Sequence, residues 1–233
     1  MRFTTFTNKG TRENNTDVVV RIMDGNVCAF VAVDGGGFCG DIAAPIIADA
    51  IKAELKSDMR VNGAIVRNCF RAANAAIKQK ADEDSGFKNV KASGAILITD
   101  GNKAVWGHIG NCRIYRLLHG KIREITSDHT QAYRDYVENK IAFEDIAENE
   151  NCELMVSINA DNEVDADVSN VKKLFFNYSF ILCTDGFWKN IANTEIEESI
   201  SKSTKVSLCA MIDKIESHGI IECDSVSAIV VNV

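Results

Sequence analysis

The chain alternates between short apolar runs and polar turns over most of its length. Two runs near its start, residues 17–23 (DVVVRIM) and 27–33 (VCAFVAV), are separated by the turn sequence DGN. A short polar turn with glycine between two such runs predicts a β-hairpin. The tight turn would bring Asp17 opposite the end of the second run, so we expect Asp17 and Asp34 to approach each other.

Apolar residues then recur at helical spacing in two segments. The first is the sequence DIAAPIIADAIKAELK at 41–56, for which we expect Asp41 as the N-cap and Pro45 in or near the first turn. The second helix is predicted for residues 61–80. Neither segment gathers reactive side chains on one face, so both are interpreted as packing helices.

Residues 92–125 have turn signals every eight to twelve residues and predict a four-stranded β-meander. A polar, acid-rich stretch follows at roughly 127–170, with a helix expected over 129–139 and a loop over 159–170. The remaining expected elements are strands 171–176 and 178–184, helices near 193–201 and 204–217, and a final strand 225–233.

Helices that come in pairs, rather than one after each strand, indicate the fold class. They favour an α+β fold, in which helix pairs cover the faces of antiparallel sheets, over a parallel βαβ fold. A length of 233 residues fits one large domain or two small ones. We interpret the acid-rich stretch as a surface insertion over the site rather than a domain boundary.

The charge and composition exclude several functions. The formal net charge is −7, so no basic excess is available to neutralise the phosphates of a nucleic acid. No apolar run approaches the roughly 20 residues of a membrane helix, and the first residues have no signal-peptide pattern. The eight cysteines form no CxxC pair, and reduced thiols are the simplest account, so we expect a cytoplasmic protein.

Acidic residues stand at the ends of the strand-like runs. Asp34 and Asp185 follow their runs and Asp224 precedes the last run, so one sheet edge could hold all three beside Asp17. Carboxylates gathered in one place repel each other unless a hard cation lies between them. These residues therefore predict a divalent-metal centre, although an Asp-Gly pair is also a common turn sequence.

Several short motifs occur in a recognisable order. They are RENNTD at 12–17, VAVDGGG, GNCRIYRL, TSDHT, CTDG and the late DSVSAIVV. This order resembles the metal-dependent Ser/Thr protein phosphatases, the protein phosphatase type 2C family, and most of all its compact bacterial members. The resemblance runs from about Thr11 to Val233. It implies an α-β-β-α sandwich of two mainly antiparallel sheets, forming a single catalytic domain over residues 1–233 with a flap-like insertion around 131–167.

The resemblance also implies roles for the acidic residues. Asp34 matches the aspartate that bridges two metal ions, and the carbonyl of Gly35 would bind the first ion. Asp185 and Asp224 match ligands of the second ion, with Asp17 near it. The expected cofactors are two Mn²⁺ or Mg²⁺ ions, which prefer oxygen ligands.

The implied chemistry is hydrolysis of phospho-Ser/Thr by a metal-bridging hydroxide, with Asp34 and Asp185 in the catalytic set. Arg12 matches the arginine that grips the substrate phosphate, a task that suits its forked guanidinium. Asp128 and His129 match the element that precedes the flap. The implied partners are a phosphorylated protein substrate and a Ser/Thr kinase or its targets, and we expect a monomer.

Some positions depart from the family pattern. Asn111 stands where the family usually has an aspartate that helps to bind a third, weaker metal, so we expect that site to be weak or absent. Thr16 replaces an acid, and the glycine turn at 36–41 is about two residues shorter. Two alternatives therefore stay open: a weakly active or inactive regulatory binding module, and an unrelated acidic metal-binding domain.

Overall fold

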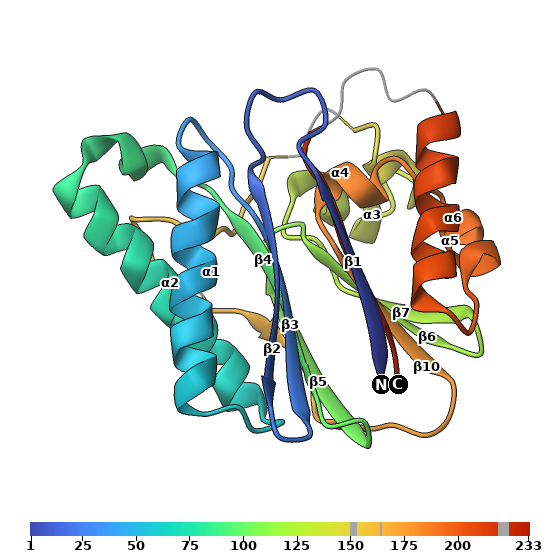
Figure 1. Cartoon of the computed structure of the whole chain (residues 1–233). Coiled ribbons are helices and arrows are strands. Elements are labelled where there is room, and N and C mark those ends of the chain that lie inside the picture. The colour runs from blue at the N-terminus through green and yellow to red at the C-terminus, as the bar shows by residue number, and fades with distance from the viewer. Residues whose placement is uncertain (150–152, 164, 219–223) are drawn as a thin grey trace.

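The protein is built from four layers, in the order helices, sheet, sheet, helices (Figure 1). The computed structural model describes residues 1–149, 153–163, 165–218 and 224–233. In both sheets every pair of neighbouring strands is antiparallel. The predicted α+β class and the sandwich of two antiparallel sheets flanked by helix pairs are therefore confirmed.

The first sheet has five strands in the order β1-β11-β10-β6-β7. It joins the two ends of the chain, because β1 pairs with β11 along its whole length. Its strands are β1 (Arg2–Asn8), β11 (Val226–Asn232), β10 (Tyr178–Cys183), β6 (Arg113–Leu118) and β7 (Lys121–Ile125).

The second sheet has the order β2-β3-β4-β5-β8, and the short strand β9 also pairs with β5. Its first two strands are the predicted hairpin, in which Asp17 is the register partner of Asp34. The strands are β2 (Asp17–Asp24), β3 (Val27–Asp34), β4 (Ser93–Thr99), β5 (Lys103–Ile109), β8 (Asp167–Val168) and β9 (Lys172–Lys173).

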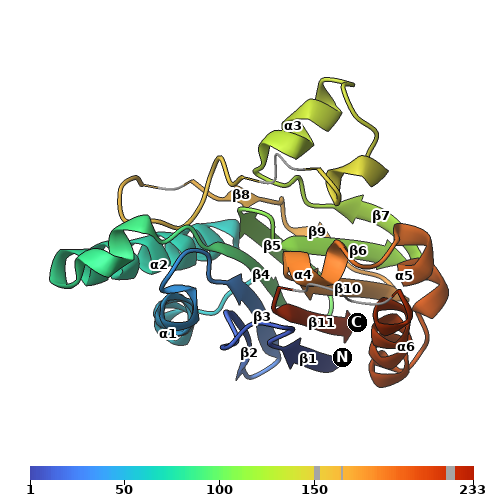
Figure 2. The ribbon, with the colours of Figure 1, turned by 90° about the horizontal axis from the view of Figure 1, so that it is seen from above.

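The helices lie on the outer faces of the sandwich, with α1 and α2 on the second sheet and α5 and α6 on the first (Figures 1 and 2). The α-helices are α1 (Gly40–Ser57), α2 (Gly63–Glu83), α3 (Gln131–Val137), α4 (Asp185–Trp188), α5 (Asn193–Ser199) and α6 (Thr204–Ser217). Two 3₁₀ helices complete the set, η1 (Ser85–Asn89) and η2 (Glu144–Ile146). Among the described residues, no helix is long and apolar enough to cross a membrane.

Three buried apolar clusters hold the layers together, one under each helix pair and one between the sheets. Between the sheets, Phe30 and Phe180 are fully buried, and the rings of Trp106 and Phe180 lie 5.5 Å apart. Burying one side chain of this size contributes roughly 1.5–3 kcal/mol. The packing fixes the two sheets against each other and so fixes the relative position of their strand ends.

The predicted meander over 92–125 is wrong in one respect. Its four strands form, but β5 and β6 belong to different sheets. The chain crosses from one sheet to the other at Gly110, which has a φ of +81°, and Asn111. A left-handed residue turns the chain out of the plane of its sheet, and this crossing brings Asn111 to the end of both sheets.

Other expectations need smaller corrections. The strand β1 was not predicted, and the strand expected over 171–176 is limited to β9. Helix α1 begins after Cys39 as N-cap, so Asp41 lies in the first turn instead, and Pro45 lies inside the helix. The expected loop at 159–170 contains β8. Helices α2, α3, α5 and α6 lie within a few residues of their predicted positions.

Candidate metal centre

The four predicted acidic residues come from both sheets. Asp17 begins β2 and Asp34 ends β3, whereas Asp185 follows β10 and Asp224 precedes β11. The expectation of a single sheet edge is therefore wrong. The acidic residues gather at one end of the two packed sheets, where the charges of Asp185 and Asp224 act on both Asp17 and Asp34.

Hydrogen bonds join the two halves of this centre. The hydroxyl of Thr184 donates to Oδ2 of Asp17 at 2.8 Å, and so links β2 to the end of β10. Ser225 Oγ accepts from the backbone N–H of Thr16 at 3.0 Å, and so links β2 to the start of β11. Segments that are distant in the sequence are thus held at hydrogen-bonding distance around the carboxylates.

Two glycines beside the carboxylates allow the backbones to approach closely. A Cβ on Gly35 would lie 2.1 Å from the carbonyl oxygen of Gly40, and one on Gly186 would lie 2.2 Å from that of Ser225. Neither Gly35 nor Gly186 has a positive φ. These Asp-Gly pairs are therefore not left-handed turns; glycine is required because another strand or helix start passes against it.

Burial and mutual repulsion raise the pKa values of Asp17 and Asp34. Burial, followed by the charges of Asp185 and Asp224, raises the pKa of Asp17 to about 7. Burial and the charges of Asp185 and Asp17 raise the pKa of Asp34 well above its usual range. In the described part of the chain, neither Asp17 nor Asp34 forms an ion pair with a cationic side chain.

Two carboxylate oxygens in this centre are buried without a hydrogen-bond partner. They are Oδ1 of Asp17 and Oδ1 of Asp185. A buried carboxylate oxygen without a partner is costly, and a divalent cation with a preference for oxygen ligands removes that cost. The donor set therefore fits Mg²⁺ or Mn²⁺.

Asp185 has two further neighbours, one of which the sequence did not reveal. Lys189 Nζ donates to Oδ2 of Asp185 at 2.7 Å, and Asn111 Nδ2 donates to the same oxygen at 3.1 Å. Lys189 lies four residues after Asp185, a spacing that places two side chains on one face of a helical turn. That spacing is the signal that could have identified Lys189.

Arg12 lies at the centre, in contact with Asp224. Its Nη2 donates to Oδ2 of Asp224 at 2.6 Å, and its Nε also contacts that carboxylate. The hydrogen bond to Asp224 is the main cause of the raised pKa of Arg12. A phosphate-binding role for Arg12 stays a prediction, as does the metal-binding role of the Gly35 carbonyl.

Asp128 forms a buried ion pair with Arg113, so its carboxylate is not free to bind a metal ion at the centre. Its two oxygens accept from Arg113 at 2.8 and 2.6 Å, and both side chains are buried. The guanidinium of Arg113 also lies 3.4 Å from the centroid of the Trp188 ring. This pair fixes the start of the segment that carries His129 and α3 against α4.

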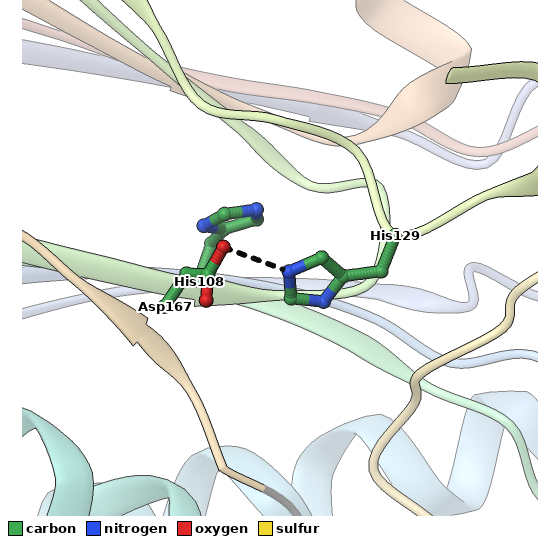
Figure 3. Close-up of side chains that lie close together, drawn as sticks. All are labelled: His108, His129 and Asp167. Atoms are coloured by element: carbon green, nitrogen blue, oxygen red, sulfur yellow. Dashed lines mark ion pairs between the residues drawn. The ribbon is translucent and has the colours of Figure 1, made fainter. Parts of the chain in front are cut away.

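Among the described residues, the potential metal ligands whose atoms all lie within 4.8 Å of one another are His108, His129 and Asp167, and not the four aspartates (Figure 3). Nε2 of His108 lies 2.7 Å from the carbonyl oxygen of Ser127, and its Nδ1 is buried without a partner. Nε2 of His129 lies 3.3 Å from Oδ2 of Asp167.

The tautomer of His129 argues against a metal ion in this group. Its Nδ1 accepts the backbone N–H of Gly110 at 3.1 Å, so the proton of the neutral ring is on Nε2 and points to Asp167. A metal ion at Nε2 would have to replace that proton or break the bond from Gly110. The aspartates offer carboxylate oxygens, two of them buried without a partner, and are the better ligands for a hard cation.

Similarity to known proteins is found both in sequence and in structure. No model of a known protein family matches the chain. In sequence, the chain is 23% identical over 191 residues to the serine/threonine protein phosphatase PstP of Mycobacterium tuberculosis. The match covers 81% of this chain and 36% of PstP, so the chain spans about a third of the length of the curated relative.

Solved structures are similar over nearly the whole chain. The serine/threonine phosphatase Stp1 from Staphylococcus aureus has a TM-score of 0.87 at 20% identity, covering 99% of this chain and 94% of that one. The catalytic domain of PstP in complex with two manganese ions has a TM-score of 0.82 at 22% identity, covering 98% and 96%. The resemblance seen in the motifs is therefore confirmed for the fold: this chain has the fold of the bacterial serine/threonine phosphatases.

Proposed function

We propose that the protein is a metal-dependent phosphatase that hydrolyses phospho-Ser/Thr in protein substrates. The observation that carries the proposal is the pair of buried carboxylate oxygens without partners, on Asp17 and Asp185, at the common end of the two sheets. The similarity to phosphatases, including one solved with two manganese ions, supports the same reading.

In this proposal Asp17, Asp34, Asp185, Asp224 and the Gly35 carbonyl would hold two Mn²⁺ or Mg²⁺ ions. When bound, the ions would supply an activated water as the nucleophile that attacks phosphorus. The chain's own part is to hold the carboxylates rigidly: Thr184 fixes one oxygen of Asp17 and leaves the other for a ligand bond.

Arg12 would bind the phosphate of the substrate. Its side chain is about half exposed and lies against Asp224, so the guanidinium is within reach of both solvent and the centre. A forked cation can meet two phosphate oxygens and stabilise the charge that develops during transfer. No nucleophilic cysteine is required, and Cys112 next to Asn111 is fully buried with its pKa raised by that burial.

The substrate and the setting belong to the same proposal. We propose a single catalytic domain with a flap beside the site over residues 131–167, of which 150–152 and 164 lie outside the described residues. The proposed substrate is a phosphorylated protein, in a pathway with a Ser/Thr kinase. The cysteines Cys28 and Cys69 are free and buried, which supports a reducing compartment such as the cytoplasm.

Hydrolysis of an aryl phosphate and of a phosphopeptide, with added Mn²⁺ and then with chelator, tests the proposal. We expect turnover with Mn²⁺, loss of turnover with chelator, and restoration by excess metal. Turnover that resists the chelator would overturn the mechanism. Calorimetric binding of Mn²⁺ without any turnover would instead support the regulatory binding module.

A further inference from the structure

Lys189 makes a contact inside the metal centre. Its Nζ donates to Oδ2 of Asp185 at 2.7 Å, and its side chain is only 27% exposed. Asp185 begins α4 and Lys189 follows the end of that helix, so the backbone of a single turn holds the two groups together. The contact is therefore short-range and does not depend on a flexible surface side chain finding its partner.

Asn111, in the connection between β5 and β6, contacts the same oxygen of Asp185. Its Nδ2 donates to Oδ2 of Asp185 at 3.1 Å, while its Oδ1 accepts from the hydroxyl of Ser93 at 2.8 Å. The hydroxyl of Ser93 fixes the orientation of the amide, because an amide that accepts with Oδ1 must present its NH₂ on the other side. Two donors therefore occupy Oδ2, whereas Oδ1 of the same carboxylate is buried without a partner.

From this asymmetry we infer that Lys189 supplies a fixed positive charge to the metal centre. Its ammonium and the amide of Asn111 together close Oδ2 of Asp185 to any further divalent ion, whereas Oδ1 stays open for a ligand bond. Lys189 thus limits the centre to two ions. The inference rests on the proposed function, because it concerns the ions that function requires.

The chemistry of the two donors explains why they exclude an ion. A cation at Oδ2 would have to displace a hydrogen bond from an ammonium and one from an amide, and would then lie beside a positive charge that cannot diffuse away. Replacing Asn111 by aspartate would not open the position, since Lys189 would form an ion pair with the new carboxylate. Only the loss of both donors would create an oxygen-lined site.

Isothermal titration calorimetry with Mn²⁺ tests this on the whole chain. We expect two binding events for the wild type, for Asn111→Asp and for Lys189→Arg, which keeps the charge. Lys189→Met should keep two events but bind roughly tenfold more tightly, because a repulsive charge is removed. The double variant Asn111→Asp/Lys189→Met should show a third event.

The matched control is Lys173→Met, an exposed lysine paired with Lys103 at the far end of β5, which should match the wild type. Circular dichroism of each variant establishes that it is folded, and Lys189→Gln serves as a second charge-free variant. A third binding event in Asn111→Asp alone would overturn the inference, and so would unchanged Mn²⁺ affinity in both Lys189→Met and Lys189→Gln. In either case the proposed function would still stand if the wild type binds two ions. A wild type that binds no Mn²⁺ would overturn both.

Discussion

Asp17 and Asp34 lie directly opposite each other in the β2–β3 pair, where β2 begins and β3 ends. Like charges in register destabilise a sheet. Here burial adds to that effect and raises the pKa of both carboxyl groups. The fold therefore keeps an unfavourable pair at its centre, and the benefit of the pair appears only when cations are bound.

Metal ions should stabilise the protein strongly. At a Mn²⁺ concentration about 100 times the dissociation constant, binding to the folded state alone adds about 2.7 kcal/mol to the free energy of unfolding. We expect the melting temperature to rise with Mn²⁺ and to return to its starting value with chelator. Melting curves of the metal-free and the Mn²⁺-titrated protein, followed by circular dichroism, measure this, and a melting temperature independent of Mn²⁺ would contradict it.

Asp34→Asn should separate stability from activity. Removing one of the repelling carboxylates should raise the melting temperature of the metal-free protein, while turnover with Mn²⁺ should fall roughly a hundredfold or more. The control is Asp213→Asn, an exposed acid on α6, which should change neither quantity. A variant with unchanged turnover would exclude Asp34 from the centre.

The β2–β3 hairpin and helix α1 could be predicted from the sequence, because the residue patterns that indicate them lie within short segments. The DGN turn and the alternating runs predicted the hairpin, and the hairpin alone brought Asp17 to Asp34. Helical spacing likewise identified α1, whose Ile47 and Ile51 are completely buried. In both cases the information lies within about twenty residues.

The division of the strands between two sheets could not be predicted from such short segments. Nothing within 92–125 distinguishes a meander from a crossing at Gly110, because either needs turn residues there. The contact of Lys189 with Asp185 was missed for a different reason. The spacing of four residues indicates that contact only if a helical turn begins at Asp185, and a four-residue helix has no apolar periodicity from which to predict that turn.

Arg12→Ala should have opposite effects on substrate and on metal. Loss of the guanidinium should lower kcat/KM for a phosphopeptide roughly a hundredfold, since two charge-assisted hydrogen bonds to phosphate are lost. It should also tighten Mn²⁺ binding, because the carboxylate of Asp224 loses the cation that contacts it. Steady-state kinetics and Mn²⁺ calorimetry on the same preparation measure both effects, and weaker Mn²⁺ binding would show that Arg12 supports the metal site instead.

The Arg113–Asp128 ion pair should be a stability element. Asp128→Ala leaves a buried guanidinium without its partner and should lower the free energy of unfolding by about 3–5 kcal/mol. The double variant Arg113→Met/Asp128→Leu should recover much of that loss, since an apolar pair carries no desolvation cost. Urea denaturation measures both, and a loss below about 1 kcal/mol in Asp128→Ala would contradict the structural role.

His108 should make stability depend on pH. Burial, followed by the charge of His129, lowers the pKa of His108 from 6.5 to about 4. Above pH 6.5 the ring is neutral in both states and its contribution to stability is complete. Between pH 6.5 and 4 the unfolded chain binds the proton and the folded chain does not, so stability falls as the pH is lowered, by about 3 kcal/mol in total.

His108→Gln, whose amide can still donate to the Ser127 carbonyl, should have a shallower decline in stability over that pH range. His119→Asn, at an exposed position with a φ of +53° that asparagine tolerates, is the control and should follow the wild type. Equal slopes for wild type and His108→Gln in urea denaturation from pH 4 to 7 would mean that His108 is protonated in the folded protein.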